Sequence, residues 1–298
     1  MLLIDWGTTS LRLFEVNDSG EILGHRRSNQ GISKIDRNQF ETILVEEISA
    51  FNEIEYLFLC GMMGSSQGHW PTTYIETPAD KTTYIEHSRS VTSTHPQLAN
   101  RRIVVMPGVR HKGKTGKIEV MRGEEAQIFG FCSTQPNFKG AVILPGTHSK
   151  WVQIQDGTII DIKTYMTGEL FQTICANTIL QHTTTSDTEI SPDLFSQGIR
   201  AAMTGESIVN TMFQSRTQVL HDRWNTAEAT SFLSGLLIGS ELHNQAGIHE
   251  TIVVIGESKL AHLYKSAFKH FNVDVTLYDD SIISGCSTFL HPSHTEAP

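Results

Sequence analysis

The sequence predicts an α/β protein built from two similar halves, and three observations support this prediction. Strand-like apolar runs alternate with helical segments along the 298 residues, which is typical of the α/β class. A strand–turn–strand unit at 2–16 recurs at 142–155. A third apolar strand, at 252–255, is followed by Gly256 and an amphipathic helix. We therefore expect a duplicated, two-lobed architecture.

The two strand–turn–strand units correspond at one constant offset. We call residues 7–10 the first turn and residues 146–149 the second turn. The aligned residues are Gly7 with Gly146, Thr8 with Thr147, and Ser10 with Ser149. Turn-forming residues follow each outgoing strand, at 17–20 and at 156–157, and these predict a further hairpin after each unit.

The remaining elements follow from local patterns. Between the two units we expect a helix at 38–50, a buried strand at 56–60, a long polar excursion at 65–100, a strand at 102–106, a basic glycine-containing loop at 108–117 and a helix beginning within 124–131. After Gly256, helical spacing gives one apolar face formed by Leu260, Leu263, Tyr264, Ala267, Phe268 and Phe271. A strand at 273–277 and a last helix at 281–290 complete the expected order.

These elements divide into two expected lobes. The N-terminal lobe comprises 1–135 and is completed by the C-terminal helix within 281–298. The C-terminal lobe comprises 136–280. Each half is long enough to bury its own core.

Composition excludes several classes of protein. The net charge of −9 and the absence of a basic cluster large enough for phosphate backbones argue against a nucleic-acid partner. The N-terminus has no signal-peptide pattern and no apolar window is long enough for a bilayer, so no membrane association is expected. The four cysteines lack metal-binding spacing, and we expect free thiols in a cytoplasmic protein.

The first turn has the residues of a magnesium–phosphate site. Asp5 ends a buried strand, where a carboxylate is costly unless it meets a cation or donors. Gly7 allows a ligand to approach the backbone, and Thr8 and Thr9 add hydroxyl groups. Such a turn suits Mg²⁺ and phosphate oxygens. The alternative is a hairpin turn with a capping aspartate.

The second turn lacks the acid, because Leu144 stands in the position of Asp5. It gains His148 and Lys150, which favour contact with phosphate oxygens, although His148 could also be a polar turn residue. Neither turn matches the phosphate loop GxxxxGK[ST] or the dinucleotide loop GxGxxG.

Two adjacent carboxylates, Glu124 and Glu125, open the helix expected after Arg122 and Gly123. Acids at a helix N-terminus are favoured by the helix dipole, so one interpretation is that they mark only a helix start. One of them could instead accept the proton of an attacking hydroxyl. Because neighbouring side chains on a helix diverge by about 100°, at most one faces a given site.

Seven motifs in order resemble the 2-dehydro-3-deoxygalactonate kinase family of the sugar-kinase/Hsp70/actin superfamily. The motifs are DWGTTSLR (5–12), CGMMGSSQG (60–68), MRGEEAQIFG (121–130), LPGTHSKWV (144–152), MTGELF (166–171), FLSGLLIGSEL (232–242) and IGESKLAHLY (255–264). The resemblance covers nearly the whole chain. It implies the actin/hexokinase-like, duplicated ribonuclease H-like fold with a nucleotide cleft between the lobes.

The resemblance also implies an activity and a set of site residues. The implied reaction transfers the γ-phosphoryl group of ATP, with Mg²⁺, to the 6-hydroxyl of 2-dehydro-3-deoxy-D-galactonate in galactonate catabolism. Asp5 is the implied metal residue, and Asp5, Glu124 and Glu125 are the catalytic candidates. The implied nucleotide residues are Gly7, Thr8, Thr9, Arg12, Gly146, Thr147, His148, Ser149, Lys150, Gly256 and Leu260. The implied substrate residues are Gly64, Ser65, Arg122, Thr167 and Glu169.

Several questions stay open at this stage. His69 intervenes where family members have tryptophan after glycine, which leaves the wall of the sugar pocket undefined. The substrate carboxylate needs a cation, for which Arg12, Arg110, Arg122 and Lys150 are the candidates. Other readings are a kinase for another sugar or sugar acid, or an ATP-dependent switch or scaffold. A homodimer and the preferred epimer also remain open.

Overall fold

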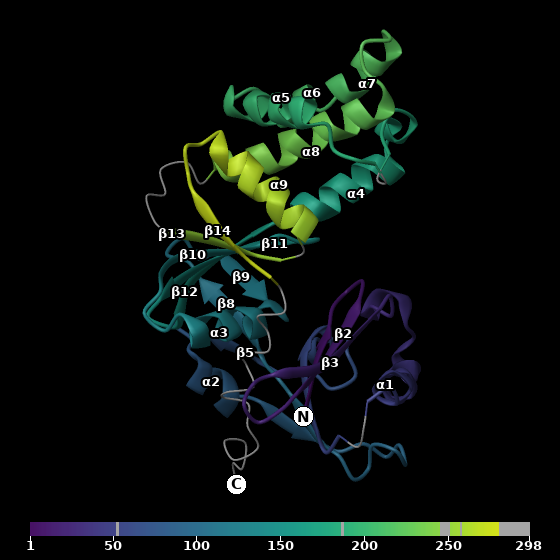
Figure 1. Ribbon diagram of the computed structural model, residues 1–298, viewed down its shortest axis with the longest axis vertical. Helices are drawn as coiled ribbons and strands as arrows, with labels where there is room; N and C mark the ends of the chain where they lie inside the picture. The colour runs from purple at the N-terminus through teal and green to yellow at the C-terminus, as the bar shows by residue number, and fades with distance from the viewer. Residues whose placement is uncertain (52–53, 186–187, 245–250, 257, 280–298) are drawn as a thin grey trace. The chain divides into compact units, whose positions relative to one another are not determined.

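The structure is a computed structural model that describes residues 1–51, 54–185, 188–244, 251–256 and 258–279. Figure 1 shows the course of the chain through these elements. The helix expected at 281–290, and with it the expected completion of the N-terminal lobe, lies outside the described residues.

The described chain forms two compact units. Unit 1 comprises Met1–Lys139 and Val152–Ile162, and unit 2 comprises Gly140–Trp151 and Lys163–Asp279. The predicted lobe boundary at 135/136 and the predicted nucleotide cleft between the lobes stay predictions.

A six-stranded mixed sheet forms the frame of unit 1 (Figure 1). Its strands are, in spatial order, β3 (Ile22–Ser28), β2 (Leu11–Val16), β1 (Leu2–Trp6), β4 (Tyr56–Gly61), β7 (Arg102–Val105) and β6 (Arg89–Val91). Strand β1 pairs antiparallel with β2 and parallel with β4. The β1–β2 hairpin therefore presents the first turn at the end of two internal strands, as predicted.

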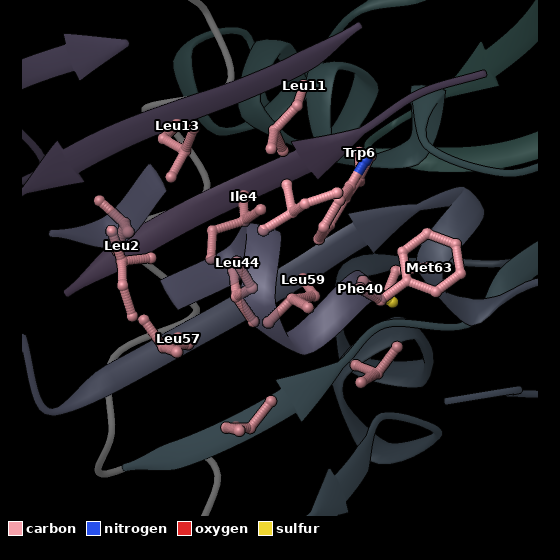
Figure 2. Close-up of a cluster of buried hydrophobic side chains, with 14 of the residues drawn as sticks. Leu2, Ile4, Trp6, Leu11, Leu13, Phe40, Leu44, Leu57, Leu59 and Met63 are labelled. Carbon is pink, nitrogen blue, oxygen red and sulfur yellow. The ribbon is translucent and has the colours of Figure 1, made fainter. Parts of the chain in front are cut away.

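Alternation along β1 separates its core residues from its acid. Leu2, Ile4 and Trp6 pack into an apolar cluster with Phe40 and Leu44 of helix α1 (Phe40–Ile48), as Figure 2 shows. Because successive strand residues point to opposite faces, Asp5 lies on the other face of this sheet.

The segment 65–100 is more ordered than expected, since it contains β5 (Tyr74–Glu76), helix α2 (Lys81–Glu86) and β6. The prediction of a loop at 108–117 is wrong. Strands β8 (Gly108–Lys112) and β9 (Ile118–Met121) form an antiparallel hairpin there, and β5 pairs with β8. One face of this hairpin is buried, with Val109 and Met121 among its residues. The basic residues on the exposed face made the segment look like a polar loop in the sequence.

Helix α3 (Glu124–Thr134) follows β9 and confirms the predicted helix start. Gly123 precedes it with a φ of 115°, a conformation that glycine adopts without strain. Most of this helix is buried, so its first turn is held firmly at one place in unit 1.

A second sheet repeats the topology of the first. Its strands are, in spatial order, β12 (Thr158–Tyr165), β11 (Ser149–Gln155), β10 (Lys139–Leu144), β13 (Thr251–Ile255) and β14 (Val275–Tyr278). This order matches β3-β2-β1-β4-β7 strand for strand, and β10–β13 is parallel like β1–β4. The shared order confirms the predicted duplication.

The helices described in unit 2 surround one buried helix, α8 (Thr226–His243). The others are α4 (Thr167–Asn177), α5 (Pro192–Met203), α6 (Ile208–Thr211), α7 (Gln214–Leu220) and α9 (Ser258–Lys269). Figure 1 shows α5, α6 and α7 gathered with α8 at the top of the view. Helix α8 is apolar on all sides and begins with a capping box from Asn225 and Glu228.

Helix α9 confirms the predicted apolar face. Tyr264, Ala267 and Phe268 are buried in the core of unit 2, and Leu260 and Leu263 pack partly buried against it. Within the described ranges, no helix has both the length and the apolar character that a membrane crossing requires.

Candidate functional site

A partly buried ion pair, between Asp5 and Arg12, lies beside the first turn of unit 1. The side chain of Arg12 donates to Asp5 Oδ2 from its Nε at 3.0 Å and from its Nη2. The register places these residues opposite each other on β1 and β2. A strand-end carboxylate thus meets a cation, as the cost of its burial requires.

Two glycines pack closely beside the other oxygen of Asp5. A Cβ atom at Gly61 would lie 3.1 Å from Asp5 Oδ1 and 2.6 Å from Trp6 O, and one at Gly123 would lie 3.5 Å from Asp5 Oδ1. Both glycines have a positive φ. Because these positions carry no side chain, the end of β4 and the start of α3 can lie beside Asp5.

Backbone contacts hold the first turn. Gly7 N–H donates to Ser10 O at 2.9 Å, Ile32 N–H donates to Gly7 O, and Ser33 N–H donates to Thr8 O, the last two both at 3.1 Å. Gly31 lies so close that a Cβ atom there would approach Thr8 O to 2.3 Å. The side chains of Thr8 and Thr9 remain exposed and available to a ligand.

The two acids at the start of α3 differ in environment. Glu125 is fully buried, and its carboxylate accepts from Val109 N–H at 3.0 Å and from Gly123 N–H at 2.5 Å. Glu124 is partly exposed and accepts from Arg122 N–H at 3.0 Å. Burial, with a further contribution from the charge of Glu124, raises the pKa of Glu125 to about 7.

The guanidinium of Arg122 is engaged by unit 1 itself. It donates from Nη1 to Thr72 Oγ1 at 2.7 Å and from Nη2 to the carbonyls of Thr72 and Thr73. It also lies over the ring of Tyr74, 4.3 Å from the centroid. Gly64 packs against the same guanidinium, because a Cβ atom on Gly64 would lie 2.7 Å from Nη1. Arg122 thus connects the start of α3 to the segment before β5.

Ser65 and His69 lie in the loop that follows β4. Ser65 is buried, and its hydroxyl oxygen accepts from the N–H groups of Gln67 and Gly68 at 3.2 and 3.1 Å. His69 lies 3.3 Å from Glu41 of α1 and packs edge-on against Trp70. The ring of Trp70 is mostly buried in the core of unit 1.

In unit 2, the second turn packs against the start of α4. Glu169 N–H donates to Thr147 O at 2.8 Å, and a Cβ atom on Gly168 would approach Gly146 O to 2.2 Å. The exposed side chains of His148 and Glu169 pair at 2.5 Å. The sequence motifs at 146–150 and 166–171 are therefore one structural feature.

Unlike the exposed His148, the next two side chains, Ser149 and Lys150, point into the protein. Ser149 is fully buried and its Oγ lies 2.7 Å from the Tyr264 hydroxyl. Lys150 is also buried and donates to Thr164 Oγ1 at 3.0 Å. A ligand at this turn would meet the backbone, Thr147 and His148 before it met the side chain of Ser149.

A buried cluster of hydrogen bonds surrounds Glu241 of α8. We call Ser149, Trp151, Thr167, Glu241 and Tyr264 the Glu241 cluster. Trp151 Nε1–H donates to Glu241 Oε1 at 2.8 Å, Tyr264 donates to Oε2 at 2.8 Å, and Thr167 donates to Oε2 as well. Burial raises the pKa of Glu241, which these donors partly oppose, and burial and the nearby carboxylate raise the pKa of Tyr264.

Gly256 and Leu260 lie at the end of β13 and on α9. Gly256 N–H donates to Tyr278 O at 3.3 Å, and a Cβ atom on Gly256 would lie 3.7 Å from Pro145, which precedes the second turn. Leu260 packs on the core of unit 2. The end of β13 is therefore adjacent to the second turn.

The structure thus gathers the predicted residues into two groups. In unit 1, Asp5, Arg12 and the first turn lie beside Gly123 and the two acids of α3. In unit 2, the second turn lies with Thr167, Glu169 and Gly256. Sequence reasoning missed Gly31, Gly61, Glu241 and Tyr264. The last two fall within recognised motifs, where a carboxylate in an apolar helix was the available signal.

The residues around Asp5 fit a magnesium ion held mainly by phosphate and water. Within the described ranges, no three His, Cys, Asp or Glu side chains converge as metal ligands. Mg²⁺ with a nucleotide usually needs only one or two protein carboxylates, because waters and phosphate oxygens complete its shell. One carboxylate at a strand end, next to the exposed threonines of the first turn, meets that need.

Comparisons with known proteins agree over nearly the whole chain. A profile of the 2-keto-3-deoxy-galactonokinase family matches residues 5–288. A Rhizobium meliloti (strain 1021) protein, "Probable 2-dehydro-3-deoxygalactonokinase DgoK1", is 33% identical over 300 residues, covering 95% of this chain and 94% of its own. The 2-dehydro-3-deoxygalactonokinase of Escherichia coli (strain K12) is 28% identical over 298 residues, 97% of each chain.

Solved structures confirm the predicted actin/hexokinase-like α/β fold. A crystal structure of a Sinorhizobium meliloti protein that carries the name 2-dehydro-3-deoxygalactonokinase superposes with a TM-score of 0.85 at 30% identity, over 96% of each chain. Component A of the Acidaminococcus fermentans (R)-2-hydroxyglutaryl-CoA dehydratase has a TM-score of 0.54 at 14% identity, over 97% of this chain and 95% of its own, and shows the fold alone. From its sequence and its fold together, this chain belongs to the 2-keto-3-deoxy-galactonokinase family.

Proposed function

We propose that this protein transfers the γ-phosphoryl group of ATP to the 6-hydroxyl of 2-dehydro-3-deoxy-D-galactonate. The observation that carries the proposal is the family match from residue 5 to residue 288, which includes both turns and the paired acids of α3. Phosphoryl transfer depends mainly on positioning and on neutralising phosphate charge, and the two turns are suited to both tasks.

The first turn is the proposed site for magnesium and phosphate. Asp5 would hold the ion, which when bound neutralises charge on the phosphate oxygens. Arg12 orients the Asp5 carboxylate and balances its charge until the ion is present. Gly7 admits the ligand to the backbone, and the exposed hydroxyls of Thr8 and Thr9 can donate to phosphate oxygens.

The second turn is the proposed site for further phosphate oxygens. Its backbone N–H groups, Thr147 and His148 are the exposed donors, and Glu169 orients the imidazole through its 2.5 Å contact. Ser149 and Lys150 support the turn from within. Gly256 and Leu260, at the end of β13 and on α9, are the proposed residues for adenosine.

Glu124 is the proposed base for the 6-hydroxyl. Its carboxylate is partly exposed at the start of α3, where a substrate hydroxyl can reach it, and it accepts from Arg122 N–H at 3.0 Å. Glu125 is fully buried and accepts from two backbone N–H groups, which suits a role in shaping the start of α3. The unequal environments support unequal roles.

The four candidate cations for the substrate carboxylate differ in how they are engaged. Arg12 pairs with Asp5, Lys150 is buried, and Arg122 binds the 72–73 backbone. Arg110 is half exposed and pairs with the still more exposed Glu76 at 2.5 Å. A substrate carboxylate would displace Glu76 at little cost, because exposed ion pairs are weak. We therefore favour Arg110 as the carboxylate ligand and Arg122 as the residue that positions Tyr74 and α3.

A coupled assay of ADP release across sugar acids and neutral sugars tests the proposal. We expect kcat/KM for 2-dehydro-3-deoxy-D-galactonate to exceed that for galactose or glucose by at least about a thousandfold, because a neutral sugar lacks the carboxylate that receives charge-assisted hydrogen bonds from the binding cation. The gluco epimer keeps the carboxylate and should lose much less.

The same assay separates the alternatives. Comparable rates on galactose would assign the protein to neutral sugars, and slow ATP turnover that no sugar stimulates would favour a switch or scaffold. We also propose that the protein acts in the cytoplasm, where ATP is available. The described cysteines, Cys60, Cys132 and Cys175, are not joined in disulfides, as a reducing compartment favours.

A further inference from the structure

Glu241 connects elements that are far apart in the sequence. Its carboxylate accepts hydrogen bonds from Trp151 on β11, from Thr167 at the start of α4 and from Tyr264 on α9. Glu241 itself belongs to α8, and it is 1% exposed. One buried carboxylate therefore fixes the mutual positions of four elements of unit 2.

Three of these elements lead directly to residues proposed for nucleotide binding. Strand β11 begins with Ser149, the last residue of the second turn. Helix α4 begins at Thr167, and its first turn contacts Thr147 through Glu169 N–H. Helix α9 follows Gly256, and its Tyr264 reaches Ser149 at 2.7 Å. Each residue that donates to Glu241 thus lies near the second turn, either in sequence or through a direct contact.

Packing alone does not require a carboxylate at this position. The surrounding core contains Ile199, Ile238, Leu242 and Phe268, and an apolar side chain would fill such a site without the cost of burying a charge. A carboxylate with three donors adds direction, because each hydrogen bond fixes a distance and an angle that apolar contacts leave variable.

The carboxylate also sets the direction of the hydroxyl groups. Tyr264 has one hydroxyl hydrogen and donates it to Glu241 Oε2. Ser149 therefore receives no hydrogen from Tyr264, and its own hydroxyl hydrogen points into the cluster, toward Tyr264 or Glu241. Hydrogen bonds that lead to the Glu241 carboxylate therefore hold Ser149, the last residue of the second turn, from inside the protein.

We propose that Glu241 is a positioning residue for nucleotide binding: it holds the second turn, the start of α4 and helix α9 in the geometry that receives ATP. This inference depends on the proposed function of the second turn. Glu241 touches no ligand, and Tyr264 and Thr167 transmit its effect.

Glu241→Gln tests the inference with almost no change in shape. The amide can keep the bond from Trp151, but its NH₂ group donates where Oε2 accepted, so the hydroxyls of Tyr264 and Thr167 must reverse. We expect the dissociation constant for ATP, measured by calorimetry, to rise about two- to thirtyfold, which is the range for residues that act without ligand contact. The KM for the sugar acid should change less than the dissociation constant for ATP. Glu124 and Arg110, its proposed contacts, lie in unit 1, and only Thr167 and Glu169 of its implied residues lie near Glu241.

Tyr264→Phe is the second variant, because it removes the hydroxyl that contacts both Ser149 and Glu241. It should raise the ATP dissociation constant in the same way, and the double variant should be no worse than the more affected single one. Ser231→Ala is the matched control. Ser231 is a buried hydroxyl on the same helix that accepts from Ser191 N–H at 2.8 Å, away from the second turn, so its loss should lower stability alone.

Three outcomes are distinguishable. Weaker ATP binding by both cluster variants and normal binding by Ser231→Ala supports the inference. Wild-type ATP affinity in folded Glu241→Gln and Tyr264→Phe proteins, with only a lowered Tm, overturns it. A wild-type protein that binds ATP but phosphorylates no sugar acid overturns the proposed function instead, and the calorimetric comparison still decides the role of Glu241.

Discussion

The two Gly-Thr turns share one backbone unit but are supported in different ways. The first turn has a carboxylate, Asp5, whose charge is balanced by Arg12, and backbone hydrogen bonds from residues 31–33 hold its loop. The second turn has Leu144 in place of the acid, and side chains of α4, α8 and α9 hold it through the Glu241 cluster.

The difference shows how a duplicated unit can acquire two tasks. Both strand ends are buried and both turns leave threonine groups accessible, so the backbone geometry is common. A carboxylate at one strand end prepares that copy for a cation, whereas its absence leaves the other copy to N–H and imidazole donors. The chemistry is decided by a few side chains, and the supporting contacts follow from them.

The largest expected effect tests this difference at the strand ends. Asp5→Asn should lower kcat by at least about a thousandfold, because it removes the charge that holds the metal. Leu144→Asn, the corresponding change in the second turn, should lower stability by about 1–3 kcal/mol through an unsatisfied buried amide. Its kcat per folded molecule should stay within a few-fold of wild type.

Steady-state kinetics on protein shown to be folded by circular dichroism provide the measurement. A folded Asp5→Asn enzyme with near-normal kcat would remove Asp5 from the metal site. Equal losses of kcat in both variants would mean that the two turns are not specialised.

The second prediction concerns the paired acids beside the first turn. Glu124→Gln should lower kcat by at least about a hundredfold, as expected for loss of a general base. Glu125→Gln should lower it far less, since the amide oxygen can still accept from a backbone N–H group. A larger loss in Glu125→Gln would exchange the two roles, and mild effects in both would leave the pair as a helix start.

Stability against pH separates Glu125 further. The usual pKa of 4.5 is raised to about 7 in the folded state, so the native protein holds this proton more tightly than the unfolded chain. The free energy of unfolding should therefore fall as pH rises from about 4.5 to 7, by up to about 3 kcal/mol. Glu125→Gln should abolish this fall, which chemical denaturation at pH 5 and pH 8 would measure. An unchanged pH profile would contradict the buried, protonated state.

The smallest predicted effect concerns the glycines that let a neighbouring segment cover each turn. Gly31→Ala and Gly168→Ala would bring a Cβ atom to within 2.3 Å of Thr8 O and 2.2 Å of Gly146 O. The covering segment must then move, and we expect kcat/KM for ATP to fall about ten- to a hundredfold in each, since displacements of about 1 Å are costly. Gly113→Ala, where the nearest atom is 3.6 Å away, is the control. If kcat/KM for ATP falls in only one of the two variants, only the turn next to that glycine depends on the segment packed against it.

Much of the fold was predictable from the sequence. The repeated turn, the hairpins that flank it, the buried strand at β4 and the amphipathic helix α9 all follow from local alternation, helical spacing and turn residues. Seven ordered motifs were enough to identify the family. These features are local because each depends on residues within a few positions of one another.

The tertiary structure decided which side chains support each turn. In the Glu241 cluster, hydrogen bonds connect α8 or α9 to β11 and to the start of α4. The bonded residues are separated by between 74 and 115 positions in the sequence. Likewise, the contact of Gly31 with Thr8, the partners of Arg122 and the β8–β9 hairpin depend on distant segments. The sequence shows that a carboxylate such as Glu241 lies in a mainly apolar helix. Burial of that carboxylate makes hydrogen bonds to it obligatory. Which residues donate those bonds is decided only when separate elements pack together in the tertiary structure.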